Sequence, residues 1–445
     1  MSNSLPGLYF PSVPKHNVIA SFDGGDLTSD AGMLLLTLAD EKVGLLSSLS
    51  KCITDRRQRG KVQHRVEELL KARVYSIASG YEDANDLDYL RSDPALKVAC
   101  GRCPKSQADL ASQPTFSRLE NCVTSKDLFR MGLTLATQVI AQLPADTTEV
   151  VLDVDATVDP CHGQQQFELF NRFYDTHCYL PLLLHVTGSD QRQRLLTSLL
   201  RPGNASYKTG LFGILRHAVR LVRARFPDAK IILRADAGFG FNDVLRFCDK
   251  HKLTFVLGLK GNPRIAVLST AVQMDACLKY RWAGDGCREF GEFAYKAMSW
   301  PSLRRVVVKA EITRGALNPR FVVCNRSDSP EEVYDFYCNR GDQENRIKEM
   351  KLDLLSGRTS CHSFMANQMR LLMHTAACVL MNCLQEAAAG TAHAKAQIGT
   401  LRLRLLKVAG RVVESCRLVR FHLPTSYPFQ EAWAHMHRWL SQPTI

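Results

Sequence analysis

The chain has 445 residues, of which 57 are Lys or Arg and 44 are Asp or Glu, so its formal net charge at pH 7 is +13. Hydrophobic residues make up 45% of the chain and charged residues 23%, which is ordinary for a globular protein and excludes a disordered tail protein or a collagen-like fibre. The length is sufficient for two or three domain-sized cores. The positive charge attracts polyanions, so nucleic acid comes first among possible partners, with a basic protein that binds no polyanion as the alternative.

The 15 cysteines are scattered along the chain. One Cys-x-x-Cys pair, Cys100 and Cys103, lacks a second pair at the spacing of a zinc finger. The opening MSNSLPGLYF has no basic segment followed by an apolar one, so no secretory signal is expected. The apolar segment from Phe364 to Leu384 contains Arg370, which favours a buried helix over a membrane span. We therefore expect a cytoplasmic protein with free thiols that does not contact a membrane.

Residues 1–125 have a mainly helical pattern and are rich in basic side chains. Apolar residues recur at three- and four-residue steps from Val66 to Ile77, which predicts an amphipathic helix whose start is basic. This surface could face the phosphates of DNA, or it could be a solvated helix face. We interpret residues 1–125 as a DNA-binding region.

Strand patterns then alternate with helical ones across residues 126–263. The predicted strands lie near residues 149–154, 180–186, 230–235 and 254–259. The predicted helices lie near residues 211–225 and 242–251. This order indicates an α/β fold built on a mixed sheet.

The remaining chain falls into three parts. Residues 264–326 carry short strand-like segments, such as the one that starts at Arg305, and are interpreted as a β-rich insertion in the α/β domain. Residues 327–395 return to helical patterns. Residues 396–445 form a basic C-terminal tail for which the pattern predicts no fold.

Three carboxylates stand at the ends of buried strands. Asp153 and Asp155 are two residues apart on one strand, so their side chains project to the same face. Asp236 follows the apolar segment that begins at Ile231. Catalytic groups in α/β sheets gather where strands end and loops begin. The alternative is that these residues cap turns, as Asp often does.

A further group of residues has helical spacing. Tyr337, Arg340, Glu344 and Lys351 are offset by 0, 3, 7 and 14 residues. On one continuous helix they would share a stripe about 60° wide, which suits a metal ligand flanked by phosphate contacts. A solvated helix with charges paired at i,i+4 is the alternative. Gly341 within this segment opposes an uninterrupted helix by about 1 kcal/mol.

The pattern Tyr-x2-Arg-x3-Glu-x6-Lys resembles the signature of DDE transposases related to the insertion-sequence 4 group. Other segments look like the insertion-sequence 1380 family, so the resemblance covers almost the whole chain. These segments are FDGGDLTSDAG from Phe22, DVDATVDPCHGQQ from Asp153, LRPGNA from Leu200, RADAGF from Arg234, NRGDQENRIKE from Asn339, and Cys361 to Asn367.

The resemblance implies a ribonuclease H-like catalytic core, formed by residues 126–263 and 327–395, with the insertion between its second Asp and its Glu. It implies that Asp155, Asp236 and Glu344 are catalytic and bind two Mg²⁺ ions, for which Mn²⁺ can substitute. Asp155 is preferred as the first ligand because the family has Thr two residues later, as at Thr157, while Asp153 is the alternative.

The resemblance also implies an activity and partners. Such enzymes are metal-dependent polynucleotidyl transferases and DNA endonucleases that move an element by cut-and-paste transposition. The expected partners are the terminal inverted repeats of the element and target DNA, which Tyr337, Arg340 and Lys351 would contact near the cleaved end. We expect a homodimer on DNA, associated with the nucleoid in the bacterial cytoplasm.

The chemistry of three acidic groups is consistent with this expectation. Clustered carboxylates repel one another, which raises their pKa values unless cations neutralise them. Mg²⁺ prefers oxygen ligands and needs only a few carboxylates beside a substrate phosphate. Two such ions can activate an attacking oxygen and stabilise the leaving 3′ oxygen. With water as the attacking group the site cuts DNA, and with the freed 3′-OH it joins DNA.

Two other functions stay open. A catalytically inactive, DNA-binding descendant of a transposase would keep the same fold. A paired-carboxylate hydrolase such as a glycosidase would use two acids, but it explains neither the Tyr-Arg-Glu-Lys pattern nor the charge. Among other polar or aromatic residues, His162 is expected to pack in a turn, and Trp282 and Trp300 are expected in a core. The segment Asn171-Arg-Phe-Tyr-Asp is expected to stabilise the sheet.

Overall fold

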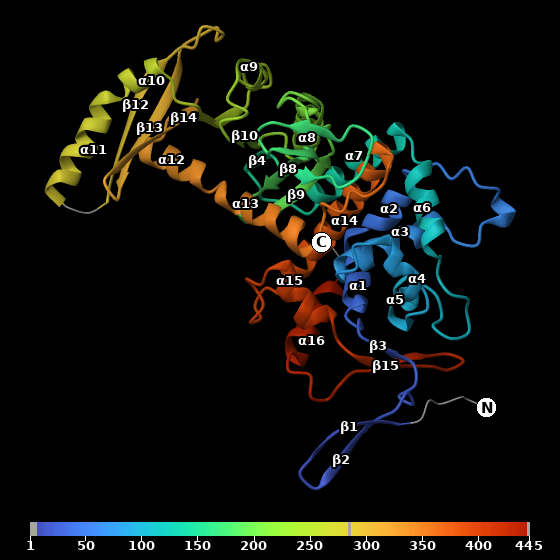
Figure 1. Ribbon diagram of the computed structural model, residues 1–445. Coiled ribbons are helices and arrows are strands. Elements are labelled where there is room, and N and C mark those ends of the chain that lie inside the picture. The colour runs from blue at the N-terminus through green and yellow to red at the C-terminus, as the bar shows by residue number, and fades with distance from the viewer. Residues whose placement is uncertain (1–6, 284–285, 443–445) are drawn as a thin grey trace. The chain divides into compact units, whose positions relative to one another are not determined.

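The computed structural model describes residues 7–283 and 286–442, and the chain divides into two compact units. The first unit comprises Met1–Leu128, Glu349–Arg358 and Ala376–Ile445, and the second comprises Phe129–Lys348 and Thr359–Thr375. Figure 1 shows the elements of both units. No helix in the described ranges is long and apolar enough to cross a membrane.

The second unit contains a mixed sheet, which confirms the predicted α/β class. Its described strands pair in the order β12-β13-β14-β11-β10-β4-β8-β9. Strand β10 runs parallel to β4 and β11, and the other neighbours in this sheet are antiparallel. The bounds are β4 Glu149–Ala156, β8 Leu182–Thr187, β9 Gln193–Leu199, β10 Lys230–Ala235, β11 Thr254–Leu259, β12 Cys287–Tyr295, β13 Arg304–Thr313 and β14 Ala316–Cys324.

Helices connect and follow these strands. Helix α8 has buried apolar residues at three- and four-residue steps, from Leu211 to Val222, and basic residues in its last turn, which favours its C-terminal end. The bounds in this unit are α8 Leu211–Arg225, α9 Asn242–Lys250, α10 Pro263–Leu268, α11 Thr270–Ala283, α12 Pro330–Cys338 and α13 Gly341–Lys348. Helices α7 (Ser125–Ala141) and α14 (Phe364–Ala387) belong partly to each unit.

The block predicted to be β-rich begins instead with helices. Pro263 occupies the first turn of α10, and the side chain of Asn262 accepts a hydrogen bond from the Ile265 N–H at 3.0 Å, so the segment starts as a capped helix. Helix α11 packs along β12 and β13, as Figure 1 shows, with Ala276 buried against Ala310 and Ile312. Strands β12–β14 then extend the central sheet beyond β11.

The first unit is mainly helical in its N-terminal part. The predicted amphipathic helix is α3, whose apolar face is buried, but Arg73 also lies inside the fold and donates to the carbonyl oxygens of Tyr81 and Glu82. The helix bounds up to residue 122 are α1 Met33–Val43, α2 Leu45–Ser50, α3 Val66–Ala78, α4 Leu87–Leu90, α5 Pro94–Ala99 and α6 Gln113–Cys122. Strands β1 (Leu8–Val13) and β2 (His16–Ala20) form a hairpin.

The basic C-terminal tail is folded. Strand β15 (Gly410–Glu414) pairs with β16 (Val419–His422) and with the N-terminal strand β3 (Leu27–Thr28). Helices α15 (Ile398–Leu401) and α16 (Gln430–Leu440) flank these strands in the sequence. The pairing joins segments almost 400 residues apart, which local patterns could not predict.

A small sheet follows β4 directly. It contains β5 (Asp159–Pro160), β7 (Thr176–Tyr179) and β6 (Leu169–Asn171), in that order. Gly203 packs on it, because the Asn171 amide donates to the Gly203 carbonyl at 2.7 Å and a Cβ atom at Gly203 would overlap the carbonyl oxygens of Leu169 and Cys178.

We predict that Gly203→Ala lowers the free energy of unfolding by about 1–3 kcal/mol, because the added methyl group meets backbone atoms that cannot move aside. Gly213→Ala is the control, because a Cβ atom there meets nothing within 4 Å and Ala favours helix α8 by about 1 kcal/mol over Gly. Urea unfolding of both variants measures the difference, and equal midpoints would contradict the packing of Gly203.

Candidate active site

Two carboxylates lie side by side at the ends of parallel strands. Strands β4 and β10 pair with Asp153 opposite Arg234 and Val154 opposite Ala235. The next residue on each strand is an aspartate, Asp155 on β4 and Asp236 after β10, so the register makes them neighbours at the same edge of the sheet. The order of strands and loops thus brings together the two acids that the sequence singled out.

The environment of Asp155 disfavours its negative charge. Burial raises the pKa of Asp155, the Arg340 guanidinium lowers it, and the nearby charge of Asp236 raises it, with a net shift above its usual value. The Asp155 Oδ2 atom accepts a hydrogen bond from Arg340 Nη2 at 2.7 Å, and its Oδ1 atom accepts one from the Ala156 N–H at 2.8 Å. Asp236 is half-buried and accepts from the Gly238 N–H at 3.0 Å. Additional positive charge would therefore stabilise this pair of carboxylates.

The third predicted carboxylate, Glu344, is connected to Asp155 through Arg340. The Glu344 side chain is 58% exposed on α13, and its Oε1 atom lies 3.9 Å from Arg340 Nη1. The Arg340 guanidinium thus contacts one strand-end carboxylate and the helical one. Its positive charge therefore lies between the two carboxylates.

Helix α13 is anchored to the sheet by its buried residue. The Gln343 amide donates to Nδ1 of His185 on β8 at 3.1 Å, and both side chains are fully or nearly fully buried. Burial, with a smaller effect of Arg346, lowers the pKa of His185 to about 3, so this imidazole is neutral and accepts the hydrogen bond. This contact sets the position of the turn that carries Glu344.

The prediction of one continuous helix from Tyr337 to Lys351 is wrong. Helix α12 ends at Cys338, Asn339 and Arg340 form a turn, and α13 begins at Gly341. The N–H of Arg340 bonds to the Tyr337 carbonyl at 3.1 Å, a tighter i→i+3 contact, and the low helix propensity of glycine agrees with a break here. Lys351 lies in the π-helical segment Glu349–Asp353, which belongs to the first unit.

Asp153, the alternative first ligand, is held by protein donors. Its side chain is completely buried and forms a two-pronged ion pair with Arg234, with distances of 2.6 Å and 2.9 Å. Gln193 donates a further hydrogen bond to Asp153 Oδ2 at 2.7 Å. Both carboxylate oxygens are therefore engaged, and their charge is neutralised inside the fold.

Arg234 was not among the residues that the sequence predicted to belong to the site. Its Nη1 atom donates to the Phe336 carbonyl at 2.6 Å, and its guanidinium lies 5.0 Å from the centre of the Phe336 ring. Arg234 thus joins β4, β10 and the last turn of α12, one residue before Tyr337. The sequence feature that could have indicated this role is an arginine within an apolar segment, two positions before Asp236.

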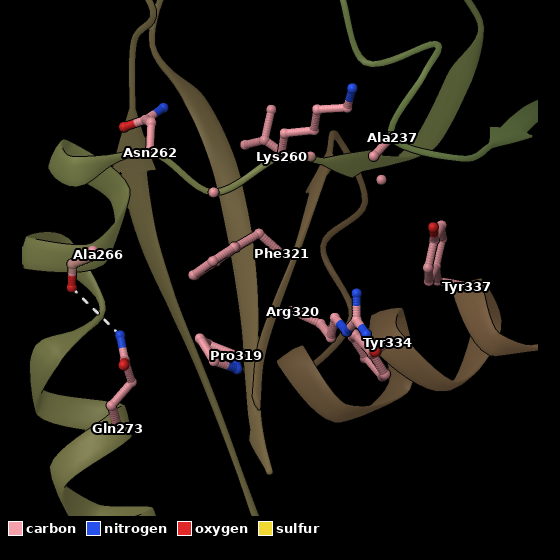
Figure 2. Close-up of a pocket in the computed structure, with 13 residues that line it drawn as sticks. Ala237, Lys260, Asn262, Ala266, Gln273, Pro319, Arg320, Phe321, Tyr334 and Tyr337 are labelled. Carbon is pink, nitrogen blue, oxygen red and sulfur yellow. Dashed lines mark hydrogen bonds between the residues drawn. The ribbon is translucent and has the colours of Figure 1, made fainter. Parts of the chain in front are cut away.

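A pocket of about 720 Å³ opens beside Ala237, the residue after Asp236. Figure 2 shows that it combines basic and aromatic side chains, with Tyr337 near Ala237. Burial raises the pKa of Tyr337. The charged and aromatic lining residues are Lys260, Arg320, Phe321, Tyr334 and Tyr337.

The donor atoms suit a hard divalent cation. Asp155 and Asp236 supply carboxylate oxygens at neighbouring positions, and Glu344 is the next carboxylate reached through Arg340. Within residues 7–283 and 286–442, no group of three or more His, Cys, Asp or Glu side chains is already gathered as a metal site. The chemistry of the donors fits a metal ion, and binding by all three requires the Glu344 side chain to turn inward.

The structure thus combines a mixed α/β sheet with acidic residues at neighbouring strand ends. The model of the family "transposase DDE domain group 1" matches residues 10–444, and the chain belongs to this family. It is a DDE transposase, a class that acts on DNA through metal-dependent nuclease and transferase chemistry with divalent ions. No curated protein matches the chain. The family match favours DNA over a non-nucleic substrate.

We predict that Arg234→Met lowers the free energy of unfolding by about 3–5 kcal/mol, because it leaves the charge of Asp153 buried without a partner. Arg304→Met is the control, because Arg304 forms a similar pair with Asp249, whose side chain is 43% exposed, and its loss costs only about 0–1 kcal/mol. Denaturant unfolding compares the two, and equal destabilisation would show that the Asp153 pair has no special structural role.

Proposed function

We propose that the protein is the transposase of a bacterial insertion sequence of the 1380 family, related to the insertion-sequence 4 group. It binds the terminal inverted repeats of its element and catalyses cleavage and strand transfer in cut-and-paste transposition. One observation carries this proposal. Asp155 and Asp236 lie next to each other at neighbouring strand ends, and Arg340 contacts both Asp155 and Glu344.

The strand order supports a ribonuclease H-like core. Taken in chain order, the strands β4, β8, β9, β10 and β11 lie in the spatial sequence 3-2-1-4-5, with the first strand parallel to the fourth. The first three strands are antiparallel neighbours, and the last two run parallel. The first aspartate then ends the central strand, where charged side chains from both neighbours can approach it.

In this proposal Asp155, Asp236 and Glu344 hold two Mg²⁺ ions, for which Mn²⁺ can substitute. Bound divalent ions supply activation of the attacking oxygen and neutralisation of the leaving 3′ oxygen. The Arg340 guanidinium donates to Asp155 Oδ2 at 2.7 Å and lowers the pKa of that carboxyl, although burial keeps this pKa above its usual value. The exposed Glu344 side chain would have to turn from Arg340 toward the aspartates to join them as a ligand. Water as the attacking group frees a 3′-OH, which attacks target DNA in the second reaction.

The DNA contacts follow from the resemblance of the Tyr-x2-Arg-x3-Glu-x6-Lys pattern to the signature of the family. Tyr337, Arg340 and Lys351 bind the DNA near the cleaved end, since a guanidinium forms a two-pronged contact with phosphate and an ammonium acts as a point charge. Lys260 and Arg320 in the adjacent pocket extend this basic surface. We infer that the protein acts as a homodimer on DNA, because two element ends are joined in one complex, and that it associates with the nucleoid.

One observation favours a second possibility, a catalytically inactive descendant that still binds DNA. Arg340 occupies the space between Asp155 and Glu344, and the three acids are not gathered as a metal site in the described part of the chain. Cleavage of DNA that carries the element ends, in the presence of Mg²⁺, separates the two functions.

We predict that Asp236→Asn and Glu344→Gln each reduce strand cleavage in Mg²⁺ by at least about 100-fold, since even the partners of metal ligands contribute about 10–100-fold. Both variants should keep their affinity for end-containing DNA, because neither acid is assigned to DNA binding. Asp342→Asn, which alters an exposed acid of the same helix, is the control and should cleave normally. Cleavage at the wild-type rate by either variant would contradict the triad.

We predict that Arg340→Ala and Lys351→Ala weaken binding to the element ends. Each should lower the slope of log affinity against log salt concentration by about 1, because one phosphate contact is lost. Lys250→Ala removes an exposed charge at the end of α9 and is the control. Fluorescence anisotropy across a salt series measures the slopes, and unchanged slopes would rule out phosphate contacts at both positions.

A further inference from the structure

Helix α8 of the second unit (Figure 1) carries a stripe of three arginines on its exposed side. Arg216, Arg220 and Arg223 are offset by 0, 4 and 7 residues, so they lie within about 60° of one another around the helix and within about 10 Å along its axis. All three side chains are exposed. The segment around them is also basic, because residues 191–227 contain eight Lys or Arg residues and no Asp or Glu. We call these three arginines the α8 stripe.

In the described part of the chain, the α8 stripe forms hydrogen bonds only to neutral groups. Arg216 donates to the carbonyl oxygen of Phe212 at 3.0 Å, and Arg223 donates to that of His251, the residue after α9. The middle arginine donates to Nδ1 of the His217 ring at 3.3 Å. Burial lowers the pKa of His217, and the charges of the two nearest arginines lower it further. The positive charge of the α8 stripe is therefore not neutralised by these contacts.

The two acids of the adjacent helix α9 are engaged elsewhere. Asp243 forms an ion pair with Lys208 at 2.5 Å, and Asp249 forms one with Arg304. Like charges at i,i+4 oppose a helix by about 0.2–0.5 kcal/mol per pair. The α8 stripe thus carries a cost for the fold by itself, and an anion bound from outside would relieve the repulsion.

Helix α8 leads away from the edge of the sheet that carries the carboxylates. Just before the helix, Tyr207 lies so close to Gly238 that a Cβ atom there would overlap its ring, and the Gly238 N–H donates to Asp236. At the other end of the helix, Arg225 donates to the carbonyl oxygen of Leu143, ahead of the start of β4, at 3.4 Å. The α8 stripe occupies the second half of this path. It therefore suits a ligand that extends beyond the reacting phosphate.

The chemistry of the α8 stripe suits the backbone of duplex DNA. A duplex rises 3.4 Å per nucleotide of each strand, so about 10 Å of stripe matches about three base pairs. Guanidinium groups bind phosphates by two-pronged contacts, which hold a duplex without reading its sequence. The core of a protein interface is instead depleted of charged residues. The family of this chain acts on DNA, so DNA is the polyanion that the observations favour.

We propose that the α8 stripe binds the backbone of target DNA a few base pairs away from the reacting phosphate. The inference rests on the proposed function, because it needs a target duplex at the carboxylates. An inverted repeat is recognised through the edges of its bases, whereas a target duplex can be held by its phosphates alone. A row of arginines on one helix face supplies only the second kind of contact.

The test uses the full-length protein with divalent metal chelated, and two duplexes of equal length. One duplex contains only the terminal inverted repeat, and the other has an unrelated sequence. Fluorescence anisotropy across a salt series gives the slope of log affinity against log salt concentration for each duplex. The triple variant Arg216→Gln, Arg220→Gln, Arg223→Gln should lower the slope for the unrelated duplex by about 2–3, because each lost phosphate contact contributes about 0.9. The slope for the inverted repeat should stay as in wild type.

Two control variants separate the charge of the α8 stripe from other effects. Replacing the same three arginines by Lys keeps the charges and should keep the wild-type slope. Arg225→Gln removes a charge from the opposite side of the same helix, about 180° from Arg216, and should leave both slopes unchanged. Gln has nearly the helix propensity of Arg, so equal melting temperatures of the triple Gln variant and wild type establish an intact fold.

Two results would overturn the role of the α8 stripe alone. One is a wild-type slope for the triple Gln variant on the unrelated duplex, and the other is a loss of equal size on both duplexes. Wild-type protein that binds the inverted repeat but not the unrelated duplex would also contradict it. Wild-type protein that binds neither duplex would overturn the proposed function, and this inference with it.

Discussion

The buried ion pair between Asp153 and Arg234 is the interaction on which the site depends. It lies across the two central parallel strands, two residues before the acids at their ends. A one-residue slip between these strands would separate the two charges inside the fold, at a cost of several kcal/mol. The pair therefore holds the register that makes Asp155 and Asp236 neighbours. Through Phe336 the same guanidinium holds the end of α12, from which the turn to Arg340 starts.

This arrangement places an internal cation where the chemistry needs one. Two neighbouring carboxylates with limited access to water repel each other, and burial adds to the cost of ionising Asp155. Arg340 offsets these effects only in part, so the pKa of Asp155 stays raised, and the Arg340 guanidinium also lies 3.9 Å from Glu344. In the proposed function the same guanidinium would contact either Asp155 or a phosphate of the DNA, so one side chain would serve both the carboxylates and DNA binding.

Much of the catalytic unit could be predicted from local patterns. The four core strands near residues 149, 180, 230 and 254, and the helix from Leu211, follow from runs of apolar residues and their periodicity. The interruption at Arg340 was signalled only weakly, by the poor helix propensity of Gly341. Helix α11 was missed because its apolar residues occur on several faces, and among its residues of described burial, 270–282, only Ala276 is fully buried. The segment Asn171-Arg-Phe-Tyr-Asp was expected to stabilise the sheet, but only Asn171 lies in a strand.

The sequence by itself determined the chemical groups: two acids at strand ends, the Tyr-Arg-Glu pattern, and the positive charge that suits DNA. Only the tertiary structure decided which partner each of these charged groups contacts. It places Asp153 in a closed ion pair and Asp155 at the open end of the strand, although both project from the same face. It also turns Arg340 toward Asp155, 185 residues away. The physical reason is that charge pairing inside a fold depends on strand register and distance in space, which the spacing of residues along the chain does not encode.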